Sequence, residues 1–130
     1  MARPLVAIVD DEAPVGKALT RLLRLAGLSV ETFASGAAFL NSLQDRPADC
    51  VVLDLHMPQM DGFEVQACLA QQQGPRVPVI VITGRDSPQA RQRALAGGAA
   101  AYLAKPLDHQ TLLEAIAVAI APHPKASPPL

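Results

Sequence analysis

Several short apolar runs of the sequence end in side chains that could take part in polar chemistry. Asp10 and Asp11 follow the first such run, and Asp54 ends a later one. Thr83 and Lys105 come directly after two further runs. A continuous apolar run bounded by turn residues is typical of a buried strand. The sequence therefore predicts carboxylates, a hydroxyl and an ammonium group at the ends of strands.

The three aspartates indicate a divalent metal site. Carboxylates that converge at one edge of a sheet would repel each other and raise one another's pKa unless a cation neutralised them. Ligation by oxygen atoms alone, with room for water, suits Mg²⁺, which binds through one or two carboxylates and commonly bridges to phosphate. We therefore predict a Mg²⁺ site that involves Asp10, Asp11 and Asp54.

The other polar groups fit a phosphoryl ligand. A metal would allow Asp54 to attack a phosphorus centre that its own charge would otherwise repel, and the product would be an aspartyl phosphate. Thr83 and Lys105 are the groups available to stabilise the charge on the transferred oxygens. The set predicts a carboxylate that takes up a phosphoryl group.

Each of these residues also has a simpler interpretation. Acidic residues after a strand are often helix caps, a threonine there is often a turn residue, and a single lysine is usually solvated. We expect His56 to be structural or solvent-facing, because a metal-binding imidazole would need a partner histidine or cysteine. The chemical interpretation depends on all these residues occurring together at strand ends.

The whole chain alternates between strand and helix patterns. Apolar runs rich in β-branched residues predict strands, and apolar residues at helical spacing predict helices. The predicted strands cover residues 5–9, 28–33, 51–54, 77–82 and 101–104. The predicted helices cover residues 13–26, 37–43, 63–72, 88–97 and 109–120, with N-caps at Ser35, Ser87 and Asp108 and a stop for the third at Gly74-Pro75.

Five strands that alternate with five helices predict a parallel sheet covered on both faces, because each parallel return needs a crossover. The fold class is therefore doubly wound α/β, in which ligands bind beyond the carboxyl ends of the strands. The helix expected over residues 88–97 has a thin apolar face, chiefly Ala90, Ala94 and Leu95. We expect that helix to be loosely held.

The bulk composition narrows the function classes. The 130 residues are 50% apolar and carry a formal net charge of −1, which predicts one domain and argues against general binding to nucleic acid or to an anionic membrane. Without a spanning segment or a signal-peptide pattern, we expect a cytoplasmic protein with Cys50 and Cys68 as reduced thiols. We place the domain at residues 1–121 and a proline-rich tail or linker at residues 122–130.

Four motifs, in order, resemble the receiver domain of bacterial two-component response regulators. The motifs are Val9-Asp10-Asp11-Glu12, the stretch from Asp54 to Gly62, Ile82-Thr83-Gly84, and Gly98-Ala99 with Tyr102-Leu103-Ala104-Lys105-Pro106. The resemblance covers about residues 4–121. It implies a flavodoxin-like sheet with strand order 2-1-3-4-5 and helices on both faces.

The resemblance also implies a role for the acidic residues. Asp54 would accept a phosphoryl group from a phosphohistidine on a sensor kinase. Asp11, Asp54 and the backbone carbonyl of His56 would bind Mg²⁺, with Asp10 acting through water.

The residues at the later strand ends would respond to the phosphoryl group. The resemblance implies that Thr83 hydrogen-bonds it, that Lys105 pairs with it, and that the Lys105–Pro106 peptide bond is cis. Tyr102 would be the aromatic switch residue that turns inward when the threonine moves. The added charge would bias an existing two-state equilibrium rather than create a new fold.

The implied function is phosphorelay signalling, with no enzyme activity beyond the domain's own phosphorylation and dephosphorylation. The face built from the fourth helix, fifth strand and fifth helix would control a partner protein or an output domain, and a homodimer could form on phosphorylation. The pair Thr83-Gly84 resembles regulators with a C-terminal helix-turn-helix domain. The chain would then be a stand-alone receiver or a receiver cut from a longer regulator at its linker.

Some positions depart from the family pattern. Ala101 stands where an acidic residue is common, and Gly97 is an extra flexible position at the end of a predicted helix. Arg85, Arg91 and Arg93 make the region of the fourth helix basic, which is either a solvated face or a docking patch for a partner.

Three other functions were weighed against this one. A phosphorylation-independent receiver-like scaffold is the main alternative, although the full set of site residues counts against it. A flavodoxin-like mononucleotide binder would need a loop of Gly, Ser and Thr after the first strand, where this chain has Asp10-Asp11-Glu12-Ala13-Pro14. An aspartate-nucleophile phosphatase would need its paired acids after the first strand, in an Asp-x-Asp motif that this chain lacks.

Overall fold

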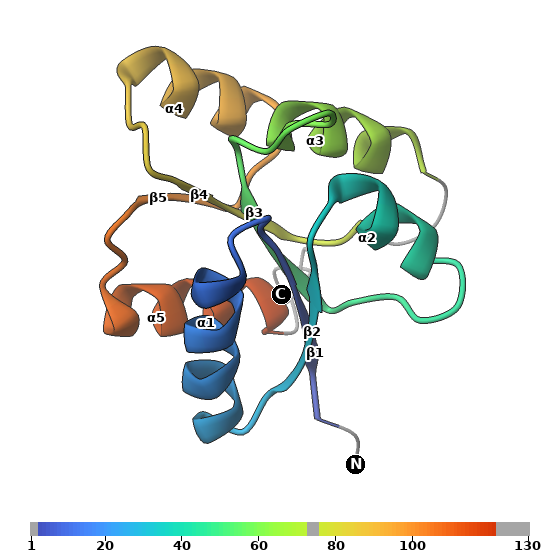
Figure 1. Ribbon diagram of the computed structural model, residues 1–130, viewed down its shortest axis with the longest axis vertical. Coiled ribbons are helices and arrows are strands. Elements are labelled where there is room, and N and C mark those ends of the chain that lie inside the picture. The colour runs from blue at the N-terminus through green and yellow to red at the C-terminus, as the bar shows by residue number, and fades with distance from the viewer. Residues whose placement is uncertain (1–2, 73–75, 122–130) are drawn as a thin grey trace, which may run out of the picture.

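The computed structural model describes residues 3–72 and 76–121, which form a five-stranded parallel sheet between two layers of helices (Figure 1). The strands are β1 (Leu5–Val9), β2 (Ser29–Phe33), β3 (Cys50–Asp54), β4 (Val79–Thr83) and β5 (Ala101–Ala104). The helices are α1 (Ala13–Leu25), α2 (Gly36–Ser42), α3 (Gly62–Gln71), α4 (Pro88–Ala96) and α5 (His109–Ile120). The strand order is β2-β1-β3-β4-β5, so the predicted fold class and order are confirmed.

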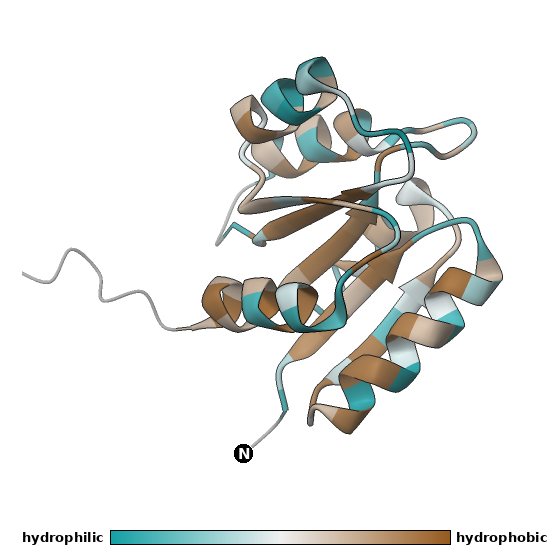
Figure 2. Ribbon diagram, turned by 90° about the vertical axis from the view of Figure 1, so that its left-hand side faces the viewer, coloured by the Kyte–Doolittle hydropathy of each residue, from teal (hydrophilic) through white to brown (hydrophobic). Residues whose placement is uncertain are grey.

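The helices divide between the two faces of the sheet. Helices α1 and α5 cover one face, and α2, α3 and α4 cover the other (Figure 1). The three inner strands, β1, β3 and β4, are buried along their whole length, and they are the most apolar part of the ribbon in Figure 2. Residues that alternate along each strand therefore feed two separate core clusters, one under each helix layer.

The register of the sheet brings the strand ends to one edge. Val9 pairs with Leu53, and Asp54 pairs with Ile82. At the next pair of strands, Thr83 is the register partner of Ala104. Because the strands are parallel, the residues that follow them leave the sheet at the same edge, which is where this fold class places its ligands.

The predicted N-caps are confirmed. The side chains of Ser35, Ser87 and Asp108 accept hydrogen bonds from backbone N–H groups in the first turns of α2, α4 and α5. The cap of α3 was missed. Asp61 accepts from the N–H of Glu64, whose carboxylate accepts in turn from the N–H of Asp61, a reciprocal arrangement known as a capping box.

Element boundaries differ from the predictions by up to two residues. Strand β4 begins at Val79 rather than at residue 77, because Pro78 has no N–H for the ladder, although its carbonyl still accepts from Val51. The predicted stop at Gly74-Pro75 and the tail at residues 122–130 lie outside the described residues, so the domain boundary stays a prediction. Within the described ranges, none of the helices combines the length and apolar character needed to span a membrane.

The thin apolar face expected for the fourth helix is confirmed, but the placing of Leu95 on that face is wrong. Ala94 is the one residue of α4 that is buried, whereas Leu95 is 43% exposed. Helix α5, by comparison, buries Leu112, Ile116 and Ala119. Burial of a large aliphatic side chain contributes about 1.5–3 kcal/mol, so α4 has little hydrophobic anchoring.

The two cysteines should differ in reactivity. Burial, together with the charge of Asp49, raises the pKa of Cys50 to about 12, and its side chain is inaccessible, whereas Cys68 is partly exposed. Because the thiolate is the reactive form, we expect iodoacetamide to alkylate Cys68 and to spare Cys50 in the folded protein. Peptide mass analysis before and after denaturation checks this. Modification of Cys50 at the same rate as Cys68 under native conditions would contradict it.

Candidate functional site

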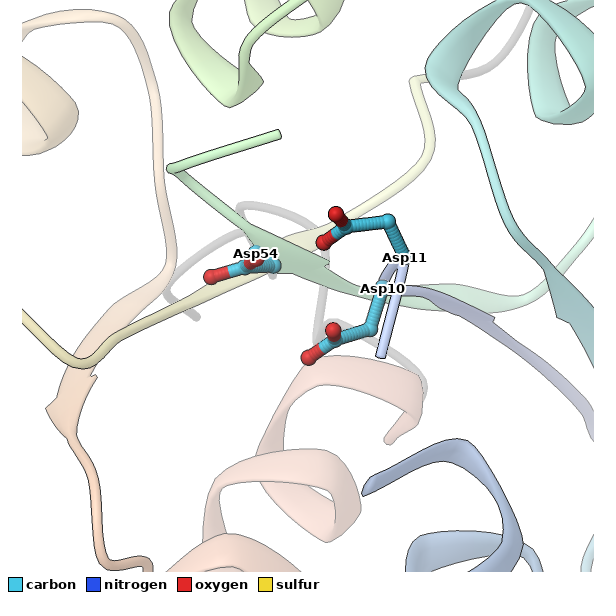
Figure 3. A group of neighbouring side chains, drawn as sticks. All are labelled: Asp10, Asp11 and Asp54. Carbon is cyan, nitrogen blue, oxygen red and sulfur yellow. The ribbon is translucent and has the colours of Figure 1, made fainter. Parts of the chain in front are cut away.

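The carboxylates of Asp10, Asp11 and Asp54 meet at the edge of the sheet (Figure 3). One oxygen of each lies within 4.8 Å of those of the other two. Asp10 is 6% exposed and Asp54 is 3% exposed, whereas Asp11 is open to solvent. Water therefore screens the charges of Asp10 and Asp54 poorly. The cluster can be reached from solvent on the side of Asp11.

The loop after β1 directs Asp10 into this cluster. The Asp10 Oδ1 atom accepts a hydrogen bond of 2.9 Å from the N–H of Glu12, two residues along the chain. Glu12 occupies the N-cap position of α1 and makes no side-chain cap. The simpler interpretation of Asp10 and Asp11 as helix caps is therefore not supported by the local hydrogen bonds.

Lys105 connects Asp10, which follows β1, with Asp54, which ends β3. Its Nζ atom lies 3.0 Å from Asp10 Oδ2, 3.3 Å from Glu12 Oε1 and 3.7 Å from Asp54 Oδ1. Burial by itself would lower the pKa of Lys105, but the hydrogen bond to Asp10 and the charge of Asp54 outweigh it and raise that pKa above its usual value. The lysine is therefore charged and fixed in the site, and the interpretation as a freely solvated lysine is wrong.

The environment of Asp54 disfavours its negative charge. Burial, followed by the charge of Asp10, raises the pKa of Asp54 to about 6, while Lys105 and a hydrogen bond from the backbone of His56 act in the opposite direction. The ordinary value is 3.8. Without a further cation, the cluster thus contains more negative charge than Lys105 compensates.

The donor set fits a hard divalent cation. The cluster offers oxygen atoms alone, two of its carboxylates are fixed by burial, and the side of Asp11 is exposed, so that water could complete a coordination shell. The imidazole of His56 is exposed and does not join the group, as expected. His109 lies at the start of α5, away from the cluster, and His123 lies outside the described residues.

Thr83 ends β4 and is fully buried. Its Oγ1 atom accepts a hydrogen bond of 3.0 Å from the N–H of Arg85, so the threonine does shape the turn, as the simpler interpretation expected. The backbone carbonyl of Thr83 accepts from the N–H of Lys105 at 2.8 Å. The Lys105–Pro106 peptide bond, for which the resemblance implied the cis form, is cis.

Tyr102 lies on β5, 7% exposed, with its hydroxyl buried and without a hydrogen-bond partner among the described residues. Burial, with a contribution from Asp86, raises the pKa of Tyr102. The guanidinium of Arg91 lies 5.6 Å from the centre of the ring, within the range of a cation–π interaction. The tyrosine therefore faces inward and contacts α4.

Two residues with long-range contacts were not singled out from the sequence, Glu12 at the site and Gln66 outside it. Glu12 binds Lys105 through its carboxylate, and its place in the acidic run after β1 was the available signal. Gln66 on α3 is buried at 4% exposure, and no pattern in the sequence distinguishes it from the exposed glutamines that follow it.

Comparison with known proteins decides the family. The family model of the response regulator receiver domain matches residues 6–117. The chain belongs to this receiver domain family. The matched residues include the acidic cluster of Asp10, Asp11 and Asp54, and also Thr83 and Lys105.

Curated relatives of the receiver are longer regulators. The chain is 38% identical to the response regulator protein TmoT of Ectopseudomonas mendocina and 36% identical to TodT of Pseudomonas putida. Each alignment covers 95% of this chain, but 57% of TmoT and 55% of TodT. The chain thus spans about half the length of these relatives.

Solved structures of receivers share the fold. A response regulator receiver protein from Burkholderia phymatum is 44% identical, with a TM-score of 0.79, and the match covers 91% of this chain and 95% of that one. The chemotaxis protein CheY4 of Vibrio cholerae is 34% identical, with a TM-score of 0.82 and coverage of 91% and 99%.

Proposed function

We propose that this receiver accepts a phosphoryl group on Asp54 from a phosphohistidine of a sensor kinase, with Mg²⁺ bound beside it. One observation carries the proposal: the cluster of Asp10, Asp11 and Asp54 is joined by Lys105, whose ammonium lies 3.7 Å from the carboxylate of Asp54. Carboxylate, metal ligands and a fixed cation are the groups that phosphoryl transfer requires.

The residues of the chain have separate roles in the transfer. Asp54 attacks the phosphorus atom, the new P–O bond forms as the P–N bond of the phosphohistidine breaks, and the imidazole nitrogen keeps the electron pair. Asp10, Asp11, Asp54 and the backbone carbonyl of His56 would hold the Mg²⁺ ion. When bound, the ion supplies the positive charge that lets an anionic carboxylate approach an anionic phosphoryl group.

The later strand ends stabilise the product. Lys105 binds a phosphoryl oxygen, and the Thr83 hydroxyl, whose oxygen accepts from the N–H of Arg85, turns to donate its O–H to the phosphoryl group. Tyr102 and α4 adjust to the new position of the threonine, and the face built from α4, β5 and α5 passes the change to a partner protein or an output domain. The chemistry is confined to the domain's own phosphorylation and dephosphorylation.

Labelling with acetyl phosphate tests the proposal. We expect the wild type to gain one phosphoryl group in the presence of Mg²⁺, as a hydroxylamine-labile adduct on the peptide that contains Asp54, and to gain none in EDTA. Asp54→Ala should not be labelled, because the attacking carboxylate is missing. Lys105→Met should be labelled about 10²-fold more slowly, because a fixed cation at the transferred group is worth about that factor. Intact-protein mass spectrometry follows the adduct.

Asp45→Ala is the matched control, because Asp45 is an exposed carboxylate in the loop before β3. It should be labelled at the wild-type rate. A wild type that stays unlabelled while another receiver is labelled in the same tube would contradict the proposal and favour the scaffold alternative. An adduct that persists in Asp54→Ala would refute the assignment of the phosphoacceptor.

A further inference from the structure

A buried glutamine on α3 is hydrogen-bonded to the end of α4. The Nε2 atom of Gln66 donates to the backbone carbonyl of Ala94 at 2.9 Å, and the side chain is 4% exposed. Helices α3 and α4 lie side by side on the same face of the sheet (Figure 1). The bond is therefore a polar link between two neighbouring helices, made by an amide that is itself buried.

The carbonyl that Gln66 contacts is also the one that ends α4. The N–H of Ala99 donates to Ala94 at 3.1 Å, and the N–H of Gly98 donates to Leu95 at 3.0 Å. Gly98 has a φ of 101°. These features define a Schellman motif, the common C-terminal stop of a helix. Gln66 thus occupies the second acceptor site of the carbonyl on which this stop is built.

Gly97 makes room for the glutamine. A Cβ atom at Gly97 would lie 3.1 Å from Nε2, 3.2 Å from Cδ and 3.3 Å from Oε1 of Gln66. These distances are tighter than ordinary contacts, so a side chain at residue 97 would displace the amide. The extra glycine noted in the sequence is therefore complementary to Gln66.

Little else fixes the C-terminal part of α4. Ala94 is its one buried residue. The guanidinium of Arg93 lies 4.0 Å from the centre of the Phe63 ring, which adds a cation–π contact to α3. The other cation–π contact of α4, between Arg91 and Tyr102, involves a residue earlier in the helix. A helix end held mainly by a hydrogen bond and one such contact is easier to release than one held by large buried side chains.

Only one of the two polar atoms of the Gln66 amide has a hydrogen-bond partner among the described residues. The Oε1 atom of Gln66 is buried and has no hydrogen-bond partner in the part of the chain that the structure describes. An unpaired buried acceptor is costly, and it would be hydrated if the end of α4 moved away. The same side chain therefore both holds α4 and carries a cost that release of α4 would remove.

We propose that Gln66 and Gly97 form a latch that sets how readily the segment from Ala94 to Tyr102 opens. The segment runs from the latch directly into β5, where the N–H of Ala100 donates to Val79 at 2.7 Å. Tyr102 follows two residues later. Release of the latch thus loosens the start of β5, the strand that carries Tyr102. This start lies at the amino ends of the strands, whereas the acidic cluster lies at their carboxyl ends.

Amide hydrogen exchange of the metal-free, unphosphorylated protein tests the latch. We expect Gln66→Leu to speed exchange at Gly98 and Ala99 roughly fivefold, the factor that one net hydrogen bond is worth. Exchange in α1 should stay unchanged. Gln71→Leu is the matched control, because Gln71 is an exposed glutamine on the same helix. It should leave the amides of Gly98 and Ala99 at their wild-type rates.

A double-mutant cycle gives a second test that does not depend on leucine at residue 66. Gly97 has a φ of −78°, which alanine adopts without strain, so Gly97→Ala acts only by displacing the Gln66 amide. It should speed the same exchange by a similar factor. Once Gln66→Ala has removed the amide, Gly97→Ala should have no further effect. Additive effects of the two substitutions would overturn the proposed pairing.

The other outcomes are also decisive. Unchanged exchange at Gly98 and Ala99 in Gln66→Leu, or an equal rise in every element, would overturn the latch. One further readout rests on the proposed function: Gln66→Leu should be labelled by acetyl phosphate roughly two- to fivefold faster, because less free energy is needed to reach the rearranged state. Failure of the wild type to be labelled contradicts the proposed function alone, and the exchange data still decide for or against the latch.

Discussion

Gly62→Ala should lower the free energy of unfolding by about 3 kcal/mol, the upper end of the range for overpacking in a buried site. A Cβ atom at Gly62 would lie 2.8 Å from the carbonyl oxygen of Asp54 and 2.8 Å from the Cα atom of Leu55. Both are backbone atoms, one in the last residue of β3 and one in the residue that follows it, so no side-chain rotation can relieve the contact. The N–H of Gly62 also donates to the Leu55 carbonyl at 2.9 Å, and that bond would be stretched.

Chemical denaturation by urea measures this effect, with Gly16→Ala as the control. A Cβ atom at Gly16 would meet its nearest neighbour, a methyl group of Thr32, at an ordinary 3.7 Å. Because alanine is also the better helix former, we expect Gly16→Ala to be neutral or stabilising by up to about 1 kcal/mol. Equal stability of the two variants would show that the loop after β3 is not close-packed.

In metal-free protein, Asp54→Asn should increase the free energy of unfolding at about pH 8 by about 1–3 kcal/mol. The folded pKa of Asp54 is raised from 3.8 to about 6. The folded state therefore holds this proton more tightly than the unfolded state, and stability falls as the pH rises from about 4 to about 6. Above about pH 6 the folded state carries the full cost of the charged Asp54 carboxylate. Solvent at the exposed side of Asp11 keeps this cost below the upper limit of about 3 kcal/mol.

Thermal unfolding at several pH values checks the sign. Near pH 4 the wild type and Asp54→Asn should have about the same stability, because the carboxyl group is then protonated in the folded state. At about pH 8, Mg²⁺ should raise the melting temperature of the wild type much more than that of Asp54→Asn. Asp45→Asn should behave like the wild type throughout. A variant at Asp54 that is less stable than the wild type at about pH 8 without metal would contradict this account.

The strand ends could be predicted from the sequence because burial on both faces leaves a simple signal. Strands β1, β3 and β4 are continuous apolar runs, so the first polar residue after each run stands out. Parallel pairing then places those residues at one edge without any knowledge of their side-chain contacts. The convergence of Asp10 and Asp54 follows from this pattern, whereas Lys105 follows β5, a strand at the side of the sheet that is only partly buried.

Contacts that depend on one side chain reaching another element could not be predicted in this way. Gln66 looks like any polar residue of an amphipathic helix, and its contacts come from another helix end, where it meets the Ala94 carbonyl and lies close to Gly97. The cap at Asp61 was missed for a different reason. The motif Asp61-Gly62 is typical of a turn, and its second use as a helix start appears only when Glu64 is included.

The contacts of Lys105 limit how its site can respond to a new ligand. An ammonium group has three N–H donors, and the Nζ atom already faces three carboxylates, at 3.0 Å, 3.3 Å and 3.7 Å. Two of the donors are hydrogen-bonded to Asp10 and Glu12, and the third faces Asp54 at a distance too long for a hydrogen bond. An arriving oxyanion can therefore use that third donor, and it must take over a bond from Asp10 or Glu12 to gain a second one. In either case the oxyanion competes with carboxylates that are already paired with the ammonium, so the free energy of binding is a difference between similar ion pairs. Such a site is well suited to reversible occupancy, since the displaced carboxylate remains beside the lysine and competes for its return.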